Sequence, residues 1–361
     1  MLNKSSLYAL ILAGGRGKRL WPKSKKIFPK HFISFTSKYS LLQETYRRLD
    51  GFIPPEHILI VTLKEQINFI KKQIPQLKNM IVEPEGKNTL SSILLGEIFI
   101  KNEDPQAILI VLPSDHFIKP RDKFLKILSK AKEFIERKDG IVTLGIKPDY
   151  PETGYGYIKI YPQKIFPDIY KVERFIEKPD LKKAKIIFQK NEYFWNLGIF
   201  IFRAGKALEE TKRFFPYLYK EFISLKEKIG NKREWEWTLK NIYRKIPSQS
   251  FDQAILEKSK SVYMLKADFS WVDLGSWLSL ERILKKDSDK NVSLGNNFLY
   301  HTDNSIIVNE ENNHLLVASG LSNTIVVHTP KVTLIYPKTQ NHEFKKLFKR
   351  LEEEKKFKKY L

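Results

Sequence analysis

The sequence contains no cysteine. A disulfide framework and a thiolate metal site are therefore excluded, and nothing in the composition indicates secretion. Long hydrophobic runs are also missing, because stretches such as residues 108–112 are strand-sized and fall far short of the roughly 20 residues that a membrane span needs. The apolar run at residues 7–12 is too short for a signal peptide and leads into charged sequence. We therefore expect no signal peptide and a cytoplasmic protein.

Acidic residues are too few to balance the basic ones. There are 64 Lys and Arg against 41 Asp and Glu, which gives a net charge of +23. Such a charge can indicate nucleic acid or an anionic membrane as partner. Here the basic residues are mostly lysines scattered among acids, as in residues 124–138 and 209–233, and no nucleic-acid-binding motif accompanies them. We expect neither nucleic acid nor a membrane as partner, and the charge suits an enzyme with anionic substrates.

Apolar patterning predicts an α/β fold. Short apolar runs typical of buried strands lie at residues 7–12, 57–62, 107–112 and 141–146. Segments with apolar residues at three- and four-residue spacing, typical of helices, lie at 41–49, 64–73, 90–100 and 124–137. This alternation indicates βαβ units and a mainly parallel sheet, whose ligands bind at the carboxyl ends of the strands.

The second half of the chain has a different pattern of apolar and polar residues. Residues 157–160 and 172–176 alternate as antiparallel strands do, and residues 207–245 are helical and polar. Residues 285–291 have the composition of a linker, and several short predicted strands follow within residues 296–337. The last segment predicts an amphipathic helix whose apolar face carries Phe344, Leu347, Phe348 and Leu351. We expect this face to cover either the region of short strands or the interface of a dimer.

A glycine-rich, basic turn follows the first predicted strand: Leu12-Ala13-Gly14-Gly15-Arg16-Gly17-Lys18-Arg19-Leu20. Glycines let the backbone approach an anion and basic side chains add charge, so the turn predicts a phosphate site and a nucleotide ligand. It is no Rossmann fingerprint, because Leu20 stands where the third glycine belongs, and no P-loop, because Arg19 replaces Ser or Thr. The alternative is a plain tight turn with two solvated arginines.

A longer set of motifs resembles one family. The run from Gly14 to Ser24 and the following Phe28-Pro29-Lys30-His31-Phe32 resemble the signature of the sugar-phosphate nucleotidylyltransferases. Further similar segments follow in the family's order: Glu83-Pro84 with Asn88-Thr89, Pro113-Ser114-Asp115-His116, Gly154-Tyr155-Gly156-Tyr157, Phe175-Ile176-Glu177-Lys178-Pro179, Trp195-Asn196-Leu197-Gly198-Ile199-Phe200, Ser250-Phe251-Asp252 and Trp271-Val272-Asp273-Leu274-Gly275-Ser276-Trp277. The resemblance therefore spans most of the chain.

The resemblance implies both a fold and a reaction. The fold is a Rossmann-like nucleotidyltransferase domain with a mixed, mainly parallel sheet at residues 1–285, followed at 286–361 by a small β-domain, left-handed β-helix-like, with a terminal helix. The Leu20-Trp21-Pro22 and Trp195-Asn196 motifs favour those members that transfer a guanylyl group from GTP to mannose 1-phosphate, giving GDP-mannose and pyrophosphate. Because the attacking phosphate is already an anion, such a reaction needs positioning and charge neutralisation, and no general base.

The resemblance also assigns catalytic roles to individual residues. Arg19 is expected to neutralise the β- and γ-phosphates and Lys30 the α-phosphate. Asp115, which follows a predicted buried strand, and Asp273 are expected to hold Mg²⁺ together with phosphate and water oxygens. Taken alone, either aspartate is more often a turn or cap residue. For His116 we expect a supporting role. The catalytic set is Arg19, Lys30, Asp115, Lys178 and Asp273.

Two further sets are implied by the same resemblance. The nucleotide-binding set is Leu12, Ala13, Gly14, Gly15, Gly17, Glu85, Asn88, Thr89 and Asp115, where residues 85–89 could equally form a loop that caps the next helix. The sugar-phosphate-binding set is Gly154, Tyr155, Gly156, Tyr157, Glu177, Lys178 and Asn196. This chain has Lys87 where the family often has arginine, and Leu197 where serine is usual.

Two alternatives remain open at the level of sequence. One keeps the chemistry and changes the substrates to another nucleoside triphosphate and hexose 1-phosphate. The other is a catalytically idle homologue that senses nucleotide sugars, against which the retained Arg19, Lys30 and both metal carboxylates argue. We further expect a homodimer.

Overall fold

The computed structural model describes residues 6–15 and 17–361, which form two compact units. Unit 1 comprises the residues up to Gly14, Tyr46–Ser114 and Lys119–Phe269, and unit 2 comprises Gly15–Thr45, Asp115–Ile118 and Ser270–Leu361. That residues 1–285 and 286–361 are separate domains stays a prediction. Arg16, part of the predicted phosphate-binding turn, lies outside the described residues.

Unit 1 is built on a nine-stranded mixed sheet with the strand order β3-β2-β1-β4-β9-β6-β10-β8-β7. The strands β3, β2, β1 and β4 pair in parallel, and β9 runs antiparallel between β4 and β6. The bounds are β1 Leu7–Ala13, β2 Ile58–Leu63, β3 Asn79–Glu83, β4 Ile108–Pro113, β6 Ile141–Ile146, β7 Tyr157–Phe166, β8 Ile169–Ile176, β9 Tyr193–Arg203 and β10 Val262–Lys266. The predicted mixed, mainly parallel sheet is confirmed, as are the antiparallel strands β7 and β8.

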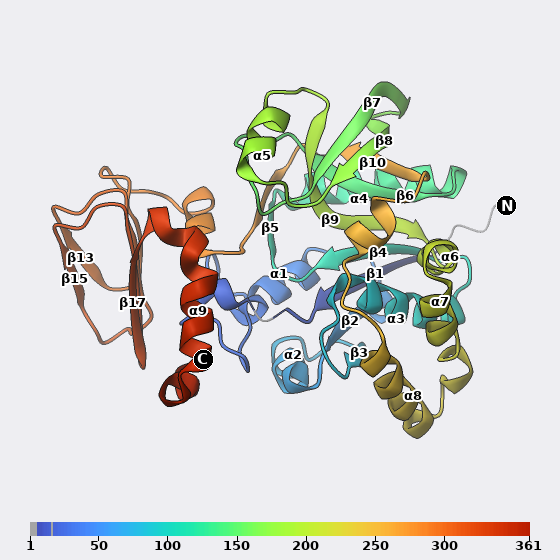
Figure 1. Ribbon diagram of the computed structural model, residues 1–361, viewed down its shortest axis with the longest axis horizontal. Helices are drawn as coiled ribbons and strands as arrows, with labels where there is room; N and C mark the ends of the chain where they lie inside the picture. The colour runs from blue at the N-terminus through green and yellow to red at the C-terminus, as the bar shows by residue number, and fades with distance from the viewer. Residues whose placement is uncertain (1–5, 16) are drawn as a thin grey trace. The chain divides into compact units, whose positions relative to one another are not determined.

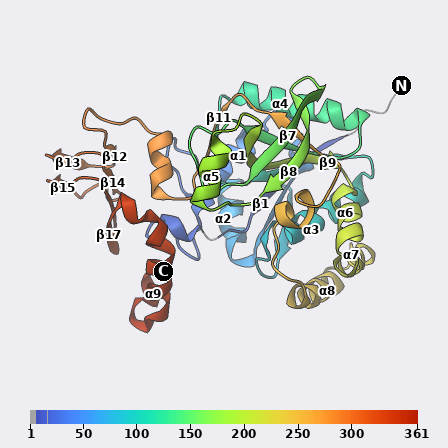
Figure 2. The same cartoon turned by 45° about the horizontal axis from the view of Figure 1, so that its top comes forward.

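Helices cover both faces of this sheet. Figures 1 and 2 show α3, α6, α7 and α8 on one face and α4 on the other. Helix α3 is buried almost all round because its sequence is apolar on every side, and its leucines and isoleucines pack on Leu10 and Val111 of the sheet. The helices are α1 Leu41–Arg47, α2 Ile67–Gln73, α3 Asn88–Glu103, α4 Arg121–Arg137, α5 Leu181–Phe188, α6 Lys206–Phe214, α7 Pro216–Ile223 and α8 Lys232–Lys245.

Unit 2 contains the small β-domain. The strands β12 (Val292–Leu294), β14 (Ile306–Asn309) and β16 (Thr324–Thr329) pair in parallel, and β17 (Val332–Pro337) closes this sheet antiparallel to β16. A second parallel pair joins β13 (Asn297–Tyr300) to β15 (Leu316–Ser319). Successive turns of the chain thus stack strand on parallel strand, as in a β-helix, and the predicted β-domain is confirmed.

The terminal helix α9 (Phe344–Glu353) covers this β-domain. Phe344 and Phe348 are buried in the core of unit 2, and the Phe344 ring packs on Tyr336 of β17 at a centroid distance of 5.4 Å. Figure 1 shows α9 beside β17. Leu347 of the predicted apolar face is 40% exposed, so this position contributes less to the packing than Phe344 and Phe348 do.

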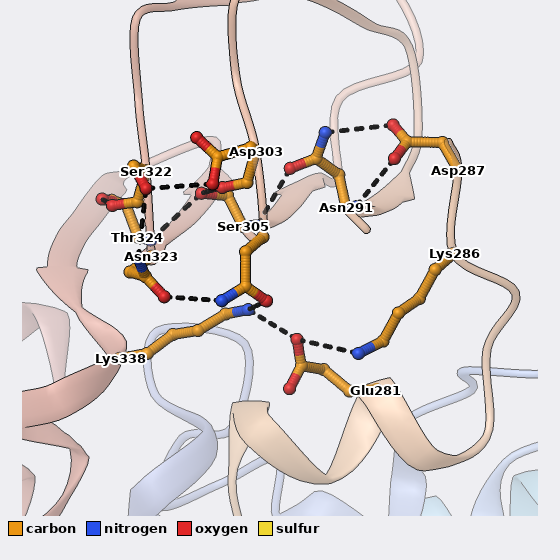
Figure 3. Close-up of polar contacts among 11 residues, drawn as sticks. Glu281, Lys286, Asp287, Asn291, Asp303, Ser305, Ser322, Asn323, Thr324 and Lys338 are labelled. Atoms are coloured by element: carbon orange, nitrogen blue, oxygen red, sulfur yellow. Dashed lines mark hydrogen bonds and ion pairs between the residues drawn. The ribbon is translucent and has the colours of Figure 1, made fainter. Parts of the chain in front are cut away.

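A polar network ties the β-domain to the rest of unit 2, as Figure 3 shows. Lys338, directly after β17, donates to Glu281 Oε1 at 2.5 Å and to Asn304 Oδ1 at 3.1 Å. Glu281 belongs to the short helix η7 (Trp277–Arg282), which follows Asp273 closely in sequence. Residues 285–291, which resemble a linker in composition, form an ordered turn in which Asp287 accepts from the backbone N–H of Asn291 at 2.7 Å.

Candidate active site

Lys30, Asp115 and Asp273 come together in unit 2. Lys30 opens the short helix η2 (Lys30–Phe32), Asp115 precedes β5 (His116–Lys119), and Asp273 ends β11 (Ser270–Asp273). Because β5 and β11 pair with each other, the two aspartates are neighbours. The Lys30 ammonium lies 2.6 Å from Asp115 Oδ2 and 3.2 Å from Asp273 Oδ1. The structure therefore unites three of the five predicted catalytic residues.

The electrostatics of this cluster favour the charged forms of Lys30 and Asp273. Burial opposes the charge of Lys30, but the carboxylates of Asp115 and Asp273 outweigh it and hold the pKa of the ammonium above its ordinary value. Burial likewise opposes the charge of Asp273, and Lys30, with His116 and Arg19, outweighs it and holds the pKa of this carboxyl below its usual range. At neutral pH Asp273 is thus an ionised carboxylate paired with the charged ammonium of Lys30.

Two residues of the predicted phosphate-binding turn, Gly17 and Arg19, lie close to this cluster within unit 2. Gly17 has φ +64, and a Cβ at this position would lie 2.6 Å from the Cβ of Lys30, so only glycine leaves room for the lysine. Arg19, in the short helix η1 (Lys18–Leu20), has its Nη2 3.0 Å from the place of a Cβ on Gly275. The glycines at 17 and 275 therefore bring two basic side chains close to Asp273.

His116 has its ring orientation set by Trp271. The indole N–H of Trp271, which can only donate, gives a hydrogen bond of 3.1 Å to Nδ1 of His116. In the neutral ring the proton must then sit on Nε2, which lies 3.9 Å from Asp115 Oδ1. The bond from Trp271 occupies Nδ1 and orients the ring so that Nε2 lies on the side of Asp115, within the group Asp115, His116 and Asp273.

The two carboxylates fit the needs of a hard divalent cation. One oxygen from each of Asp115 and Asp273 falls within a group whose ligand atoms all lie within 4.8 Å of one another. Two carboxylates plus phosphate and water oxygens are a donor set that Mg²⁺ accepts. Lys30 between them shows that the pair already attracts positive charge.

The predicted nucleotide-binding residues of unit 1 lie at the carboxyl end of β1 and in the loop before α3. Gly14 faces Glu83, whose Oε2 would lie 3.7 Å from a Cβ on the glycine. Glu83 is buried and accepts from Tyr243 and Ser92; burial raises the pKa of its carboxyl to about 7. That Leu12, Ala13 and Gly14 bind nucleotide stays a prediction.

Residues 85–89 make polar contacts with one another and with the segment that precedes Asp252. Glu85 pairs with Lys87 at 3.2 Å, and Asn88, at φ +70, accepts from the backbone N–H of Thr89 at 2.9 Å. The Thr89 hydroxyl accepts from the backbone N–H of Phe251 at 2.8 Å. Helix α3 begins at Asn88; its N-cap residue Lys87 makes no side-chain cap hydrogen bond, whereas the Asn88 side chain satisfies the first-turn N–H of Thr89. A role for these residues in binding the nucleoside stays a prediction.

The predicted sugar-phosphate residues form a second cluster within unit 1. Glu177 pairs with Lys178, whose φ is +43, and a Cβ on Gly156 would lie 2.9 Å from Glu177 Oε2. The backbone N–H of Asn196 donates to the carbonyl of Gly156 at 2.8 Å. The structure thus brings Gly156, Glu177, Lys178 and Asn196 within one region of unit 1.

The aromatic members of that set are packed into the protein. Tyr157 is fully buried and donates its hydroxyl to the carbonyl of Glu152 at 2.7 Å. Tyr155 packs edge-on against Trp195 at a centroid distance of 5.3 Å. Gly154 donates its N–H to Glu152 Oε1 at 2.6 Å. These contacts shape the loop, and direct sugar contacts by Gly154, Tyr155 and Tyr157 stay predictions.

Sequence reasoning missed two polar residues in this cluster. The Thr143 hydroxyl donates to Asn196 Oδ1 at 2.7 Å, and Asn196 Nδ2 donates to Asp252 at 2.7 Å. Thr143 is a polar residue inside the otherwise apolar strand β6, and this is the signal that marks it, because a buried polar group needs a partner. Asp252 stands in the motif Ser250-Phe251-Asp252, to which sequence reasoning assigned no role.

Comparisons with known proteins identify the family of this chain. The family model described as nucleotidyl transferase matches residues 8–290, well over half of the chain. The chain belongs to the nucleotidyl transferase family. It is 34% identical over 344 residues to a mannose-1-phosphate guanylyltransferase of Escherichia coli, covering 92% of this chain and 72% of that protein. It is also 34% identical to a mannose-1-phosphate guanylyltransferase of Salmonella muenchen, over 95% of this chain and 73% of that protein.

A solved structure extends the similarity to the whole fold of this nucleotidyltransferase. The crystal structure named as a mannose-1-phosphate geranyltransferase from Thermus thermophilus matches with a TM-score of 0.86 at 31% identity. The match covers 96% of this chain and 99% of that one. Separately, no helix in the described residues 6–15 and 17–361 has the length and apolar character that crossing a membrane requires.

Proposed function

We propose that this protein transfers a guanylyl group from GTP to mannose 1-phosphate and releases pyrophosphate. The observation that carries the proposal is the cluster of Lys30 between Asp115 and Asp273, in a chain 34% identical over nearly its whole length to a mannose-1-phosphate guanylyltransferase. A phosphate oxygen of mannose 1-phosphate attacks the α-phosphorus of GTP, the bond from that phosphorus to the bridging oxygen of the β-phosphate breaks, and pyrophosphate leaves with the electron pair.

The residues supply charge and position in this reaction. Lys30 neutralises the α-phosphate, where negative charge grows during attack, and Arg19 the phosphates that leave. Backbone N–H groups of Gly14, Gly15 and Gly17 bind the triphosphate. On the acceptor side, Lys178 holds the phosphate of mannose 1-phosphate. No side chain has to remove a proton from the nucleophile, which agrees with the absence of a general base from the proposed set.

Asp115 and Asp273 are proposed to hold the magnesium ion. When bound, Mg²⁺ supplies charge neutralisation to phosphate oxygens at the site of transfer. The two carboxylates fix its place, and the N–H of Trp271 holds His116 so that its Nε2 side faces Asp115. With the carboxylates holding the ion, the ammonium of Lys30 would be available to pair with the α-phosphate.

The test is pyrophosphate release with Mg²⁺ across a grid of GTP, ATP, UTP and dTTP against mannose 1-phosphate and glucose 1-phosphate. The proposal expects release with GTP and mannose 1-phosphate and little with the other pairs. Release with a different pair keeps the chemistry and overturns the substrates. No release from a folded sample across the whole grid favours the idle nucleotide-sugar-sensing homologue.

A further inference from the structure

Asp252 belongs to a motif of the chain to which the proposed function gives no role. It is the first residue of the π-helical turn η6 (Asp252–Leu256), which follows Ser250 and Phe251. π-Helical turns are rare, and they occur frequently at functional sites because they displace one residue from the regular helical pattern. Asp252 is neither fully buried nor fully exposed. The residue as a whole is therefore not sealed inside the hydrophobic core of unit 1.

The contacts of Asp252 determine how Asn196 is oriented. A carboxylate can only accept, so the amide NH₂ of Asn196 must face Asp252, at 2.7 Å. The amide oxygen then faces Thr143, whose hydroxyl donates to it at 2.7 Å. The side-chain oxygen of Asn196 and one of its two side-chain N–H groups are thus occupied. The remaining N–H is the only group of this amide that can bind a ligand, and it can only donate. Asp252, in the same cluster, offers an acceptor.

The surroundings of Asp252 leave it ionised and incompletely bonded. Burial, and next the negative charge of Glu177, raise the pKa of its carboxyl to about 6, while Lys178 opposes that rise. At pH 7 the group is still mainly ionised. Across residues 6–15 and 17–361, the hydrogen bond from Asn196 is the only one that a side chain gives to Asp252. A carboxylate has room for several more.

The segment that carries Asp252 is anchored to the predicted nucleotide loop of unit 1. The backbone N–H of Gln249 donates to the carbonyl of Lys87, and the N–H of Leu90 donates to the carbonyl of Gln249, both at 3.2 Å. Phe251 adds its hydrogen bond to the Thr89 hydroxyl. Three backbone bonds therefore fix the position of the segment just before Asp252.

From these contacts we propose that Asp252 accepts a hydrogen bond from a ring hydroxyl of the hexose 1-phosphate and, with the amide of Asn196 as neighbouring donor, selects the sugar. The inference rests on the proposed function, since it takes a hexose 1-phosphate as the acceptor substrate. Glu177 and Lys178 of the same cluster then contact the hexose 1-phosphate as well. Thr143 is a positioning residue that acts through Asn196.

The first test is Asp252→Asn, which keeps size and shape but removes the charged acceptor. The KM for mannose 1-phosphate should rise about 10- to 100-fold, as expected for a lost hydrogen bond to a charged group. The KM for GTP should change less than about twofold, because the bond concerns the sugar alone. An unchanged GTP value also shows that the variant is folded. The matched control is Glu257→Gln, an exposed carboxylate close to the end of the same turn, which should leave both constants unchanged.

Deoxy analogues of mannose 1-phosphate identify the hydroxyl. With the wild-type protein, the analogue that lacks the hydroxyl bound by Asp252 should show a raised KM. With Asp252→Asn, that same analogue should show no further rise, whereas the other analogues should. Equal penalties with every analogue, or equal rises in the KM of GTP and of mannose 1-phosphate, overturn the proposal.

Thr143→Val provides a second route should Asp252→Asn fail to fold. The substitution keeps the side-chain volume nearly constant and removes the hydroxyl that orients the Asn196 amide. The KM for the sugar phosphate should rise several-fold, by about the cost of one neutral hydrogen bond, and the KM for GTP should not change. An unchanged sugar KM contradicts the proposal. If the wild type uses another hexose 1-phosphate, the same comparison is made with that substrate, so failure of the substrate assignment is separate from failure of this inference.

Discussion

The ammonium of Lys30 lies 2.6 Å from the carboxylate of Asp115, and on its other side 3.2 Å from Asp273. The two carboxylates are the proposed ligands of a metal ion, and the ammonium is the proposed partner of the triphosphate. Asp115→Asn and Asp273→Asn should each lower the initial rate of pyrophosphate release by about 10²- to 10³-fold, since a charge that acts on the transferring phosphate is lost.

The folded state should survive both substitutions, as judged by circular dichroism. Asp268→Asn, at an exposed carboxylate 67% accessible in its side chain, is the matched control and should keep the full rate. A near-normal rate in either Asp115→Asn or Asp273→Asn would show that the metal site is wrongly assigned.

Gly17 is predicted to be irreplaceable because of Lys30. Its positive φ of 64 strains any side chain, and a Cβ would stand 2.6 Å from the lysine Cβ. Gly17→Ala should therefore lower the free energy of unfolding by about 1–3 kcal/mol and reduce turnover, because Lys30 must move. At Gly15 a Cβ meets nothing within 4 Å, so Gly15→Ala should leave substrate-free stability unchanged. Equal thermal stability of the two variants would contradict this account.

Glu83 should make stability depend on pH. Burial raises the pKa of its carboxyl from 4.5 to about 7, so the folded protein keeps a proton that the unfolded chain has already released. Stability should consequently fall as pH rises from about 4.5 to 7, by at most about 3 kcal/mol from this group, and level off above.

Glu83→Gln removes that titration and should reduce the slope, while Glu97, whose pKa burial also raises to about 7, keeps its own contribution. The measurement is urea unfolding without nucleotide at pH 5, 6 and 8. The exposed Glu236→Gln serves as the comparison and should retain the wild-type slope. A Glu83→Gln profile parallel to the wild type would show that Glu83 ionises normally in the folded state.

Lys338 and Glu281 should stabilise the β-domain of unit 2 as a pair. The lysine side chain is only 9% exposed, and its loss leaves Glu281 with Lys286 at 3.5 Å as its remaining cation. Lys338→Met should destabilise the protein by about 1–3 kcal/mol in thermal or urea unfolding. Lys338→Met combined with Glu281→Gln should cost less than the sum of the two single changes, and strict additivity would argue against a functional pair.

Much of the fold could be predicted from the sequence because its signals are local. The strands at residues 7–12 and 141–146 are apolar runs, and the helix at 124–137 has a clear apolar stripe, so each was found from its own residues. Four of the six short strands of the β-domain, β14 to β17, were also found, because turn residues separate them, whereas β12 and β13 were not. The predicted position of Asp115 at a strand end follows from the same reasoning.

Which residues meet in the site depends on strand pairing, and local sequence patterns do not show which strands pair. Asp273 meets Asp115 only because β11 pairs with β5, two strands of four residues each that are too short to display periodicity. The link from Thr143 to Asn196 depends on the antiparallel register of β6 and β9, which shifts at an irregularity after Thr143. The family resemblance supplied Asp115, Asp273 and Asn196 as candidates, whereas Thr143 emerged only from the structure.

The most direct test of the central claim follows the label of GTP. The protein is incubated with Mg²⁺, mannose 1-phosphate and GTP carrying radioactive phosphorus at either the α- or the γ-position. Guanylyl transfer predicts that the α-label appears in GDP-mannose and the γ-label in pyrophosphate. Retention of the α-label in GTP, or release of the γ-label as inorganic phosphate with no GDP-mannose formed, would contradict the proposed function.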